Sequence, residues 1–175
     1  MYQHILCLDI DDCILPSDYT CFGQVDDSLH LLQLNMKRIS MMLEKYNMGV
    51  FITSSWYSIL KIDEVTNCLA YNRKISHKNQ KDEYEAFQTI SDGIGNRIIG
   101  LSSGCRFNDI INLLNDGYKV VALDDMDLCS QKIKNLNKLV SDETIDSHYL
   151  FVETVGFITN IISYKIHSFI NRSPI

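Results

Sequence analysis

Two aspartates at the end of an apolar run are the residues of this chain best suited to chemistry. The run Ile5–Ile10 has the composition of a buried strand, and Asp9 and Asp11 stand at its carboxyl end. Residues i and i+2 of a strand point to the same side, so both carboxylates would leave the strand together. Two anions held that close require a cation, and their hard oxygen atoms favour Mg2+. Beside a metal-bound phosphate, one carboxylate could attack phosphorus while the other moves a proton.

A cluster of hydroxyl groups follows the second apolar run. Val50–Ile52 is followed by Thr53, Ser54 and Ser55, and then by Trp56, the only tryptophan. A hydroxyl and a free backbone N–H at the start of a helix form a natural site for a phosphate oxygen. We therefore predict that Thr53 or Ser54 grips a phosphoryl group and that Ser55 and Trp56 contact substrate. The indole could stack on a base, although a lone tryptophan after a strand more often belongs to the core.

Three further charged residues are expected at the same edge. The run Val120–Leu123 ends in Asp124 and Asp125, and Arg106 stands at the start of an expected helix. Buried like charges repel each other unless a cation joins them, so the aspartate pair predicts a metal site. Arg106 could bind a phosphate through two parallel hydrogen bonds. The order of these groups and their common place after strands indicate one site.

The elements that must position these groups are strands that alternate with helices. Strands are predicted at Ile5–Ile10, Gly49–Ser54, Arg97–Ser102, Lys119–Asp124 and Tyr149–Glu153. Helices are predicted at Leu29–Tyr46, Tyr57–Tyr71, Asn108–Asn115, Ser130–Leu139 and Ile158–Ile170. This alternation predicts a three-layer, Rossmann-like α/β fold, with about five parallel strands and helices on both faces of the sheet. In such open sheets the ligand binds outside the carboxyl ends of the strands.

The chain is expected to form a single domain, residues 1 to 175. Its 175 residues are 46% apolar, and it has only two prolines, with no linker or repeat. The segment between Cys13 and Asn35 is too short for a folded cap domain. Any cap would therefore be built from residues 61 to 96, and we predict a minimal cap or none.

Composition limits the partners and the compartment. The net charge of −6 excludes the global basic field that drives non-specific binding to duplex nucleic acid. One local basic stretch could contact nucleic acid, and it comprises Arg73, Lys74, His77, Lys78 and Lys81. Six scattered cysteines without a Cys-x-x-Cys pair predict reduced thiols. The start of the chain shows no signal-peptide pattern, and the apolar segment 149–164 is too short to span a bilayer. We therefore expect a cytoplasmic protein with no signal peptide and no membrane partner.

These residues resemble the motifs of the haloacid dehalogenase-like hydrolase superfamily. Its members share an Asp-x-Asp first motif, a Ser or Thr second motif, a Lys or Arg third motif and a carboxylate pair as the fourth. The matching residues are Asp9 and Asp11, Ser54 or Thr53, Arg106, and Asp124 with Asp125. A finer pattern is similar to the domain of this superfamily in Swiss-army-knife RNA-repair proteins, and it comprises Ser54–Trp56, Leu123–Asp125, Phe151–Glu153 and Gly156–Thr159.

The resemblance implies a Mg2+-dependent phosphatase that works through an aspartyl-phosphate. Asp9 would be the nucleophile, and Asp11 would protonate the leaving oxygen and then activate water. An acid at position 11 points to phosphoryl transfer to water, because dehalogenating members lack one there. Mg2+ would be held by Asp9, the backbone carbonyl of Asp11, and Asp124 or Asp125.

Two positions depart from the superfamily pattern. Asp12 stands where glycine is common, although aspartate tolerates unusual turn geometry. Arg106 stands where lysine is more usual, and arginine keeps the charge while presenting a planar fork. With Ser54, it would still grip the phosphoryl oxygens and stabilise charge in the transition state.

Three other classes of protein use similar groups. A phosphoacceptor receiver domain is disfavoured, because there the acidic pair follows the first strand and the acceptor lies on a central strand. A metal-dependent nuclease with an acidic pocket could use the same four carboxylates and would not need Ser54 or Arg106. A non-catalytic binding module is the third. For a phosphatase, the substrate could be a phosphorylated small molecule, a nucleotide, or an RNA or DNA end.

Overall fold

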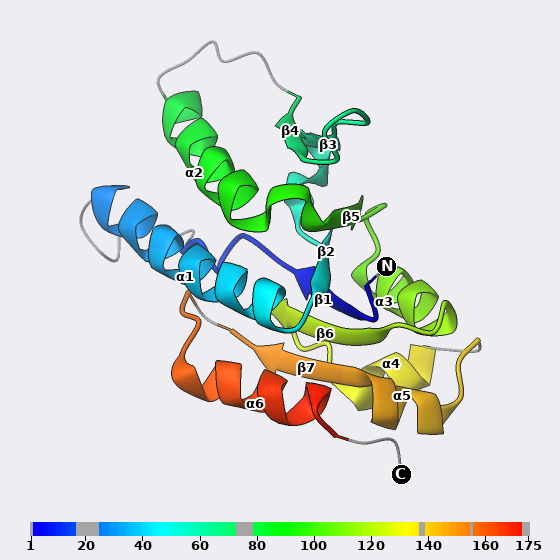
Figure 1. The fold of residues 1–175 in the computed structure, drawn as a ribbon. Helices are drawn as coiled ribbons and strands as arrows, with labels where there is room; N and C mark the ends of the chain where they lie inside the picture. Colours follow the sequence, from blue (N-terminus) through cyan, green and yellow to red (C-terminus); the bar gives the residue numbers. More distant parts are fainter. Residues whose placement is uncertain (1, 17–24, 73–78, 137–138, 155, 173–175) are drawn as a thin grey trace.

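The structure is a computed structural model that describes residues 2–16, 25–72, 79–136, 139–154 and 156–172. Its centre is a five-stranded sheet in the order β5-β2-β1-β6-β7, and every pairing in it is parallel. The strands are β1 (His4–Leu8), β2 (Met48–Ile52), β5 (Ile98–Leu101), β6 (Lys119–Asp124) and β7 (Tyr149–Glu153). The predicted Rossmann-like α/β class is confirmed (Figure 1).

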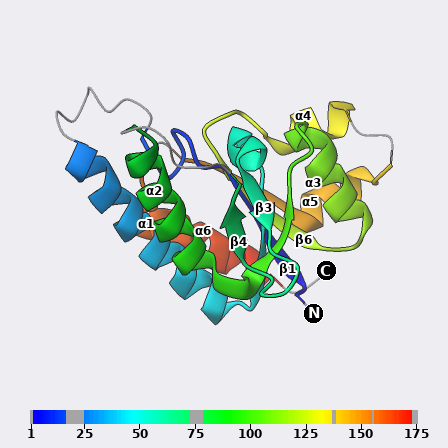
Figure 2. The ribbon, with the colours of Figure 1, turned by 90° about the horizontal axis from the view of Figure 1, so that it is seen from above.

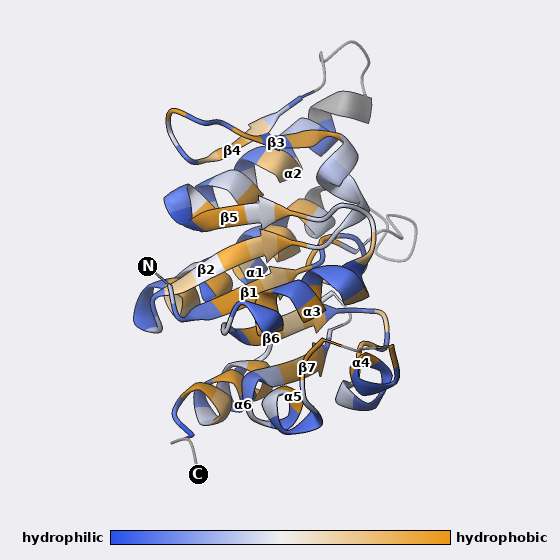
Figure 3. Cartoon of the chain, turned by 90° about the vertical axis from the view of Figure 1, so that its right-hand side faces the viewer, coloured by the Kyte–Doolittle hydropathy of each residue, from blue (hydrophilic) through white to orange (hydrophobic). Residues whose placement is uncertain are grey.

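Helices cover both faces of the sheet (Figures 1 and 2). One layer contains α1 (Val25–Lys45), α2 (Asn79–Ile94) and α6 (Asn160–Ile170). The other contains α3 (Arg106–Asn115), α4 (Ser130–Leu136) and α5 (Asp142–His148). Side chains alternate along β1 between the layers, since Leu6 and Leu8 join the core under α1 whereas Ile5 and Cys7 join the core under α3. Figure 3 shows the resulting pattern, with apolar strands inside and polar residues on the outer sides of the helices.

The register of the central strands brings their ends to one edge. Leu8 of β1 pairs with Ile52 of β2 and with Leu123 of β6. The backbone ladder continues one residue further, because the Asp9 N–H donates to the carbonyl of Leu123 and the Thr53 N–H donates to that of Leu8, both at 3.0 Å. The residues that follow all three strands therefore emerge together.

The predicted helix over Tyr57–Tyr71 is wrong. The chain forms a short 3-10 helix, η1 (Ser55–Ser58), and then an antiparallel hairpin of β3 (Leu60–Ile62) and β4 (Leu69–Tyr71). The turn is built by Asp63, whose carboxylate accepts hydrogen bonds from the N–H groups of residues 65 and 66, and by Asn67, which has a φ of 52°. Local side-chain bonds of this kind compete with helix formation.

Two helices were not predicted from the sequence, α2 and α5. Helix α2 lies along α1, and its Phe87, Ile90 and Ile94 enter the same core as Met36 of α1. It therefore belongs to a helix layer, and the β3–β4 hairpin is the remaining structured addition among the described residues from 61 to 96. This agrees with the prediction of a minimal cap.

Three further sequence predictions concern the basic stretch, the cysteines and membrane spans. The basic residues Arg73, Lys74, His77 and Lys78 lie outside the described residues, as does the side chain of Lys81. Cys21 also lies outside them, and the other five cysteines are free thiols. Within the described part of the chain, no helix combines the length and hydropathy that a membrane span needs.

A buried asparagine joins the loops that follow β1 and β7. The Asn35 side-chain amide donates to the carbonyls of Ile14 and Gly156 and accepts from the Ile158 N–H, all at 2.9 Å. Replacing Asn35 by alanine is expected to lower the free energy of unfolding by about 3 kcal/mol, because three backbone groups lose their partners in a buried site. Urea unfolding measures this, with Asn112→Ala on the exposed face of α3 as the control. Equal losses in both variants would contradict it.

Candidate active site

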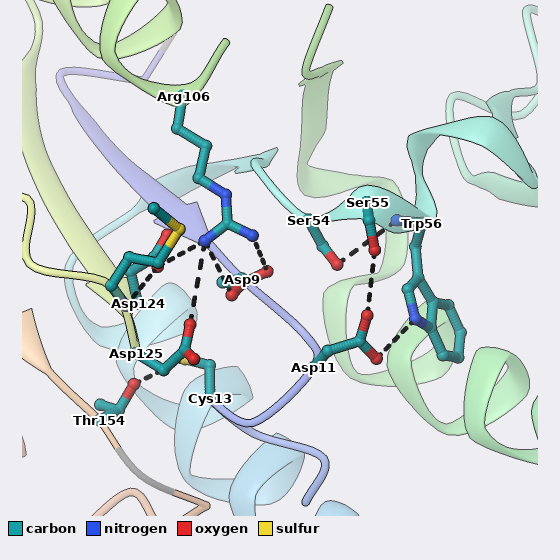
Figure 4. A network of polar contacts seen from close by, with 11 residues as sticks. Asp9, Asp11, Cys13, Ser54, Ser55, Trp56, Arg106, Asp124, Asp125 and Thr154 are labelled. Carbon is teal, nitrogen blue, oxygen red and sulfur yellow. Dashed lines mark hydrogen bonds and ion pairs between the residues drawn. The ribbon is translucent and has the colours of Figure 1, made fainter. Parts of the chain in front are cut away.

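The predicted site residues gather at the carboxyl edge of the sheet (Figure 4). Asp9 follows β1, Asp124 ends β6, and Arg106 opens α3 and reaches toward both. The Arg106 guanidinium binds Asp9 with both terminal nitrogens, with Nη1 at 3.0 Å and Nη2 at 3.2 Å from the carboxylate oxygens. The same Nη1 lies 2.5 Å from Oδ1 of Asp124 and 3.9 Å from Oδ1 of Asp125. One cation thus serves three carboxylates.

Burial makes this concentration of charge costly. The side chains of Asp9 and Asp124 are each 1% exposed, and that of Arg106 is 21% exposed. Loss of solvent and the nearby Asp124 raise the pKa of Asp9 to about 7, and Arg106 opposes this rise only in part. Burial also raises the pKa of Asp124, against the hydrogen bond from Met126 and the charge of Arg106. A further cation would stabilise both carboxylates in their charged forms.

The carboxylates offer ligand atoms for such a cation. Oxygen atoms of Asp9, Asp124 and Asp125 all lie within 4.8 Å of one another. Oδ1 of Asp124 accepts from Arg106 and from the Met126 N–H, whereas Oδ2 is buried and has no hydrogen-bond partner. An unpartnered buried carboxylate oxygen beside two further carboxylates fits a hard divalent cation such as Mg2+.

Asp11 is directed away from this group, although the sequence predicts it as part of the same site. Its carboxylate accepts hydrogen bonds from the Ser55 hydroxyl at 3.1 Å and from Nε1 of Trp56 at 2.9 Å (Figure 4). Trp56 is only 9% exposed and packs in the core. A buried ring has no open face on which a base could stack, so this geometry does not support stacking by Trp56. The contact of Trp56 with the site residues is the hydrogen bond from its Nε1–H to Asp11.

The two candidate hydroxyl residues of the second motif are both buried. Thr53 is 3% exposed, and its backbone continues the ladder to β1. Ser54 is fully buried and caps η1, since its hydroxyl oxygen accepts from the Trp56 N–H at 3.4 Å. This cap places the Ser54 hydroxyl at the start of η1, two residues after the end of β2.

The turn after the Asp-x-Asp motif has the geometry that glycine would favour. Asp12 has a φ of 58°, in the left-handed region that aspartate tolerates better than most residues. Its N–H donates to the carbonyl of Leu15 and its carbonyl accepts from the Gly156 N–H, at 2.8 and 2.9 Å. The backbone at position 12 therefore accommodates aspartate in place of the glycine that is common there in the superfamily pattern.

The sequence analysis placed Arg106 in the site but assigned no role to Ser102, Ser103 and Asp109, which hold the loop that carries Arg106. The Ser102 hydroxyl donates to Asp109 at 2.5 Å and accepts from the Gly104 N–H, and Ser103 donates to the other oxygen of Asp109. These bonds tie the end of β5 to the first turn of α3. A serine directly after a predicted strand and an acid three residues after Arg106 were the available signals.

The fold and this edge define a Rossmann-like α/β protein with a candidate acidic metal site. In comparisons with family models, curated proteins and solved structures, no significant match to this chain was found. Any function must therefore be argued from the site itself.

The raised pKa of Asp9 has a consequence for stability. An acid whose pKa rises on folding, here from its ordinary 3.8 to about 7, binds more protons in the native state than in the unfolded state. The free energy of unfolding should therefore fall as pH increases through that range, and the loss should be complete above it. We expect the metal-free protein to lose stability relative to Asp9→Asn as the pH rises from about 4 to about 7, measured by urea unfolding with chelator present. The same dependence of the free energy of unfolding on pH in both proteins would contradict this expectation.

Proposed function

We propose that this chain is a Mg2+-dependent phosphomonoester hydrolase that works through an aspartyl-phosphate, as the resemblance to haloacid dehalogenase-like hydrolases implies. The observation that supports it best is the meeting of a buried carboxylate, a guanidinium and two further acids at the carboxyl edge of a parallel sheet. In open α/β sheets this edge is where ligands bind. A predicted second-motif hydroxyl, Ser54, follows the neighbouring strand.

In the proposed reaction, Asp9 attacks phosphorus and forms a new oxygen–phosphorus bond as the ester bond breaks. Asp11 gives a proton to the leaving oxygen, and it takes a proton from the water that then hydrolyses the aspartyl-phosphate. Asp9, Asp124 and Asp125 would hold Mg2+, which when bound neutralises charge between carboxylate and phosphate.

Arg106 and Ser54 would bind the phosphoryl oxygens. Arg106 already lies against Asp9, the residue that would become phosphorylated, so small movements would bring its guanidinium to the new phosphate. Ser54 would donate its hydroxyl hydrogen, because its oxygen already accepts from the helix backbone. These donors would stabilise charge that develops in the transition state.

The substrate class is a phosphorylated small molecule, a nucleotide, or the terminal phosphate of RNA or DNA. The β3–β4 hairpin is the small structured addition near this edge, so a polynucleotide end could reach the site without a cap domain opening. A phosphate-release screen across mononucleotides and 5′- or 3′-phosphorylated oligonucleotides separates these substrates.

The same screen tests the metal. Activity is expected to vanish with chelator and to return with Mg2+, whereas Ca2+ should support it poorly because its looser and higher coordination misplaces the nucleophile. Initial rates of phosphate release at equal metal concentrations measure this. Equal rates with Ca2+ and Mg2+ would count against the proposed geometry, and no release from any substrate would refute the phosphatase.

A further inference from the structure

The Asp11 carboxylate is held by two donors from one short helix. Oδ2 accepts from the Ser55 hydroxyl and Oδ1 accepts from Nε1 of Trp56, at 3.1 and 2.9 Å. With one donor on each oxygen, the rotation of the carboxylate is defined. Figure 4 shows this contact on the side of Asp11 that faces away from the ion pairs of Arg106.

The donors themselves are fixed in place. The Trp56 ring packs in the core, and its backbone N–H and carbonyl are bonded to the Ser54 hydroxyl and the Ile59 N–H. The acceptor is fixed as well, since the turn after Asp11 is held by the Gly156 N–H. Preorganised groups of this kind hold a side chain without reorganisation during a reaction.

The contact separates Asp11 from carboxylates with a different task. Asp9, Asp124 and Asp125 place oxygen atoms within 4.8 Å of one another around Arg106, and Asp11 does not join them. The Ser55 hydroxyl and the Trp56 N–H are neutral donors, so they hold the Asp11 carboxylate apart from the other three without adding a positive charge beside it. Two carboxylates kept in different environments can perform different proton tasks.

We propose that Trp56 and Ser55 are positioning residues that hold Asp11 for proton transfer to the leaving-group oxygen. The proposal rests on the proposed function, in which Asp11 moves that proton. An indole N–H can only donate, so Oδ1 stays an acceptor, whereas a serine hydroxyl can donate or accept. Oδ2 is therefore the oxygen that carries the proton. It gives this proton to the oxygen of the breaking phosphorus–oxygen bond, and it later receives one from the attacking water.

The test compares substrates that need this proton with substrates that do not. Trp56→Phe removes the N–H and keeps an aromatic ring, and Ser55→Ala removes the hydroxyl. For alkyl phosphates, whose leaving groups are poor, kcat/KM is expected to fall by roughly 10-fold or more in each variant, a part of what general acid catalysis contributes. For p-nitrophenyl phosphate it should fall by less than about 3-fold, because its leaving group departs without a proton. A merely structural role would lower both rates equally.

Matched controls lie on the same helix. Tyr57 is exposed, and the Ser58 hydroxyl bonds to the Ser55 carbonyl rather than to Asp11. Tyr57→Phe and Ser58→Ala should leave the ratio of the two rates unchanged. In an Asp11→Ala background, adding Trp56→Phe should have no further effect on the ratio, because the residue acts through Asp11.

A second measurement does not depend on activity. Trp56 is the only tryptophan, so its fluorescence reports the contact directly. Asp11→Ala should shift its emission, whereas Asp116→Ala at the end of α3 should not. An unchanged spectrum, or equal losses on both substrates in an active protein, would overturn the positioning role alone. A wild-type protein that is inactive on every phosphomonoester would overturn the proposed function, and the positioning role with it.

Discussion

Replacing Asp9 by asparagine is expected to abolish phosphate release while the fold stays intact. The amide has nearly the shape of the carboxylate but is not a nucleophile, so the oxygen–phosphorus bond cannot form. A loss of roughly 10⁴-fold or more is expected for removal of a nucleophile. Because burial and Asp124 raise the pKa of Asp9, removing its charge also relieves repulsion, and the metal-free variant should be at least as stable as wild type at neutral pH.

The measurement is phosphate release in Mg2+ with purified protein, together with urea unfolding in chelator. Asp116→Asn, an exposed carboxylate at the end of α3, is the control and should keep full activity. Turnover retained by Asp9→Asn would exclude the aspartyl-phosphate. Loss of both activity and fold would leave Asp9 with a structural role only.

Substitution of the proposed phosphate-binding groups is expected to have the second largest effect. Ser54→Ala and Arg106→Ala should each lower the rate for phosphomonoesters by roughly 10²-fold or more, the scale of losing one transition-state donor. Arg106→Ala also removes the cation beside two buried carboxylates, so Arg106→Lys is needed as a variant that keeps the charge. It should recover part of the activity, because lysine lacks the planar fork. Ser147→Ala on the exposed face of α5 should have no effect.

The same variants separate a phosphatase from a nuclease. A monoester presents three non-bridging oxygens to the hydroxyl, the guanidinium and the metal, whereas a diester presents two and carries a second bulky substituent. Internal phosphodiesters should therefore not be cut. The experiment uses a 5′-phosphorylated, end-labelled oligonucleotide and a circular one of the same sequence, and it compares released phosphate with shortened strands. Linearised circles, with activity indifferent to Arg106→Ala, would favour the nuclease.

The sheet and the edge at which its polar groups gather followed from the sequence. Runs such as Ile5–Leu8 and Val120–Leu123 are apolar without interruption, as strands covered on both faces must be, so their type and order could be predicted. Residues at the carboxyl ends of such runs meet at one edge of a parallel sheet, and this does not depend on the conformation of the loops. This is why the sequence predicts that Asp9, Ser54 and Asp124 lie in one site.

The segment from 55 to 97 was not predictable in this way. Its helix α2 is amphipathic and gains its stability by packing on α1, far away in sequence. The hairpin before it depends on side-chain bonds of Asp63 and on the left-handed Asn67, which a periodicity argument does not detect.

By itself, the sequence determined the class of fold, the edge at which the acids stand and the types of groups available there, because strand periodicity is a local property. Only the tertiary structure decided which of those side chains contact one another. It brought Arg106 to Asp9 and Asp124 across 97 and 18 residues, and it turned Asp11 toward Ser55 and Trp56. Side-chain direction at a loop depends on partners that are distant in sequence, so spacing alone placed Asp9 and Asp11 together where packing separates them.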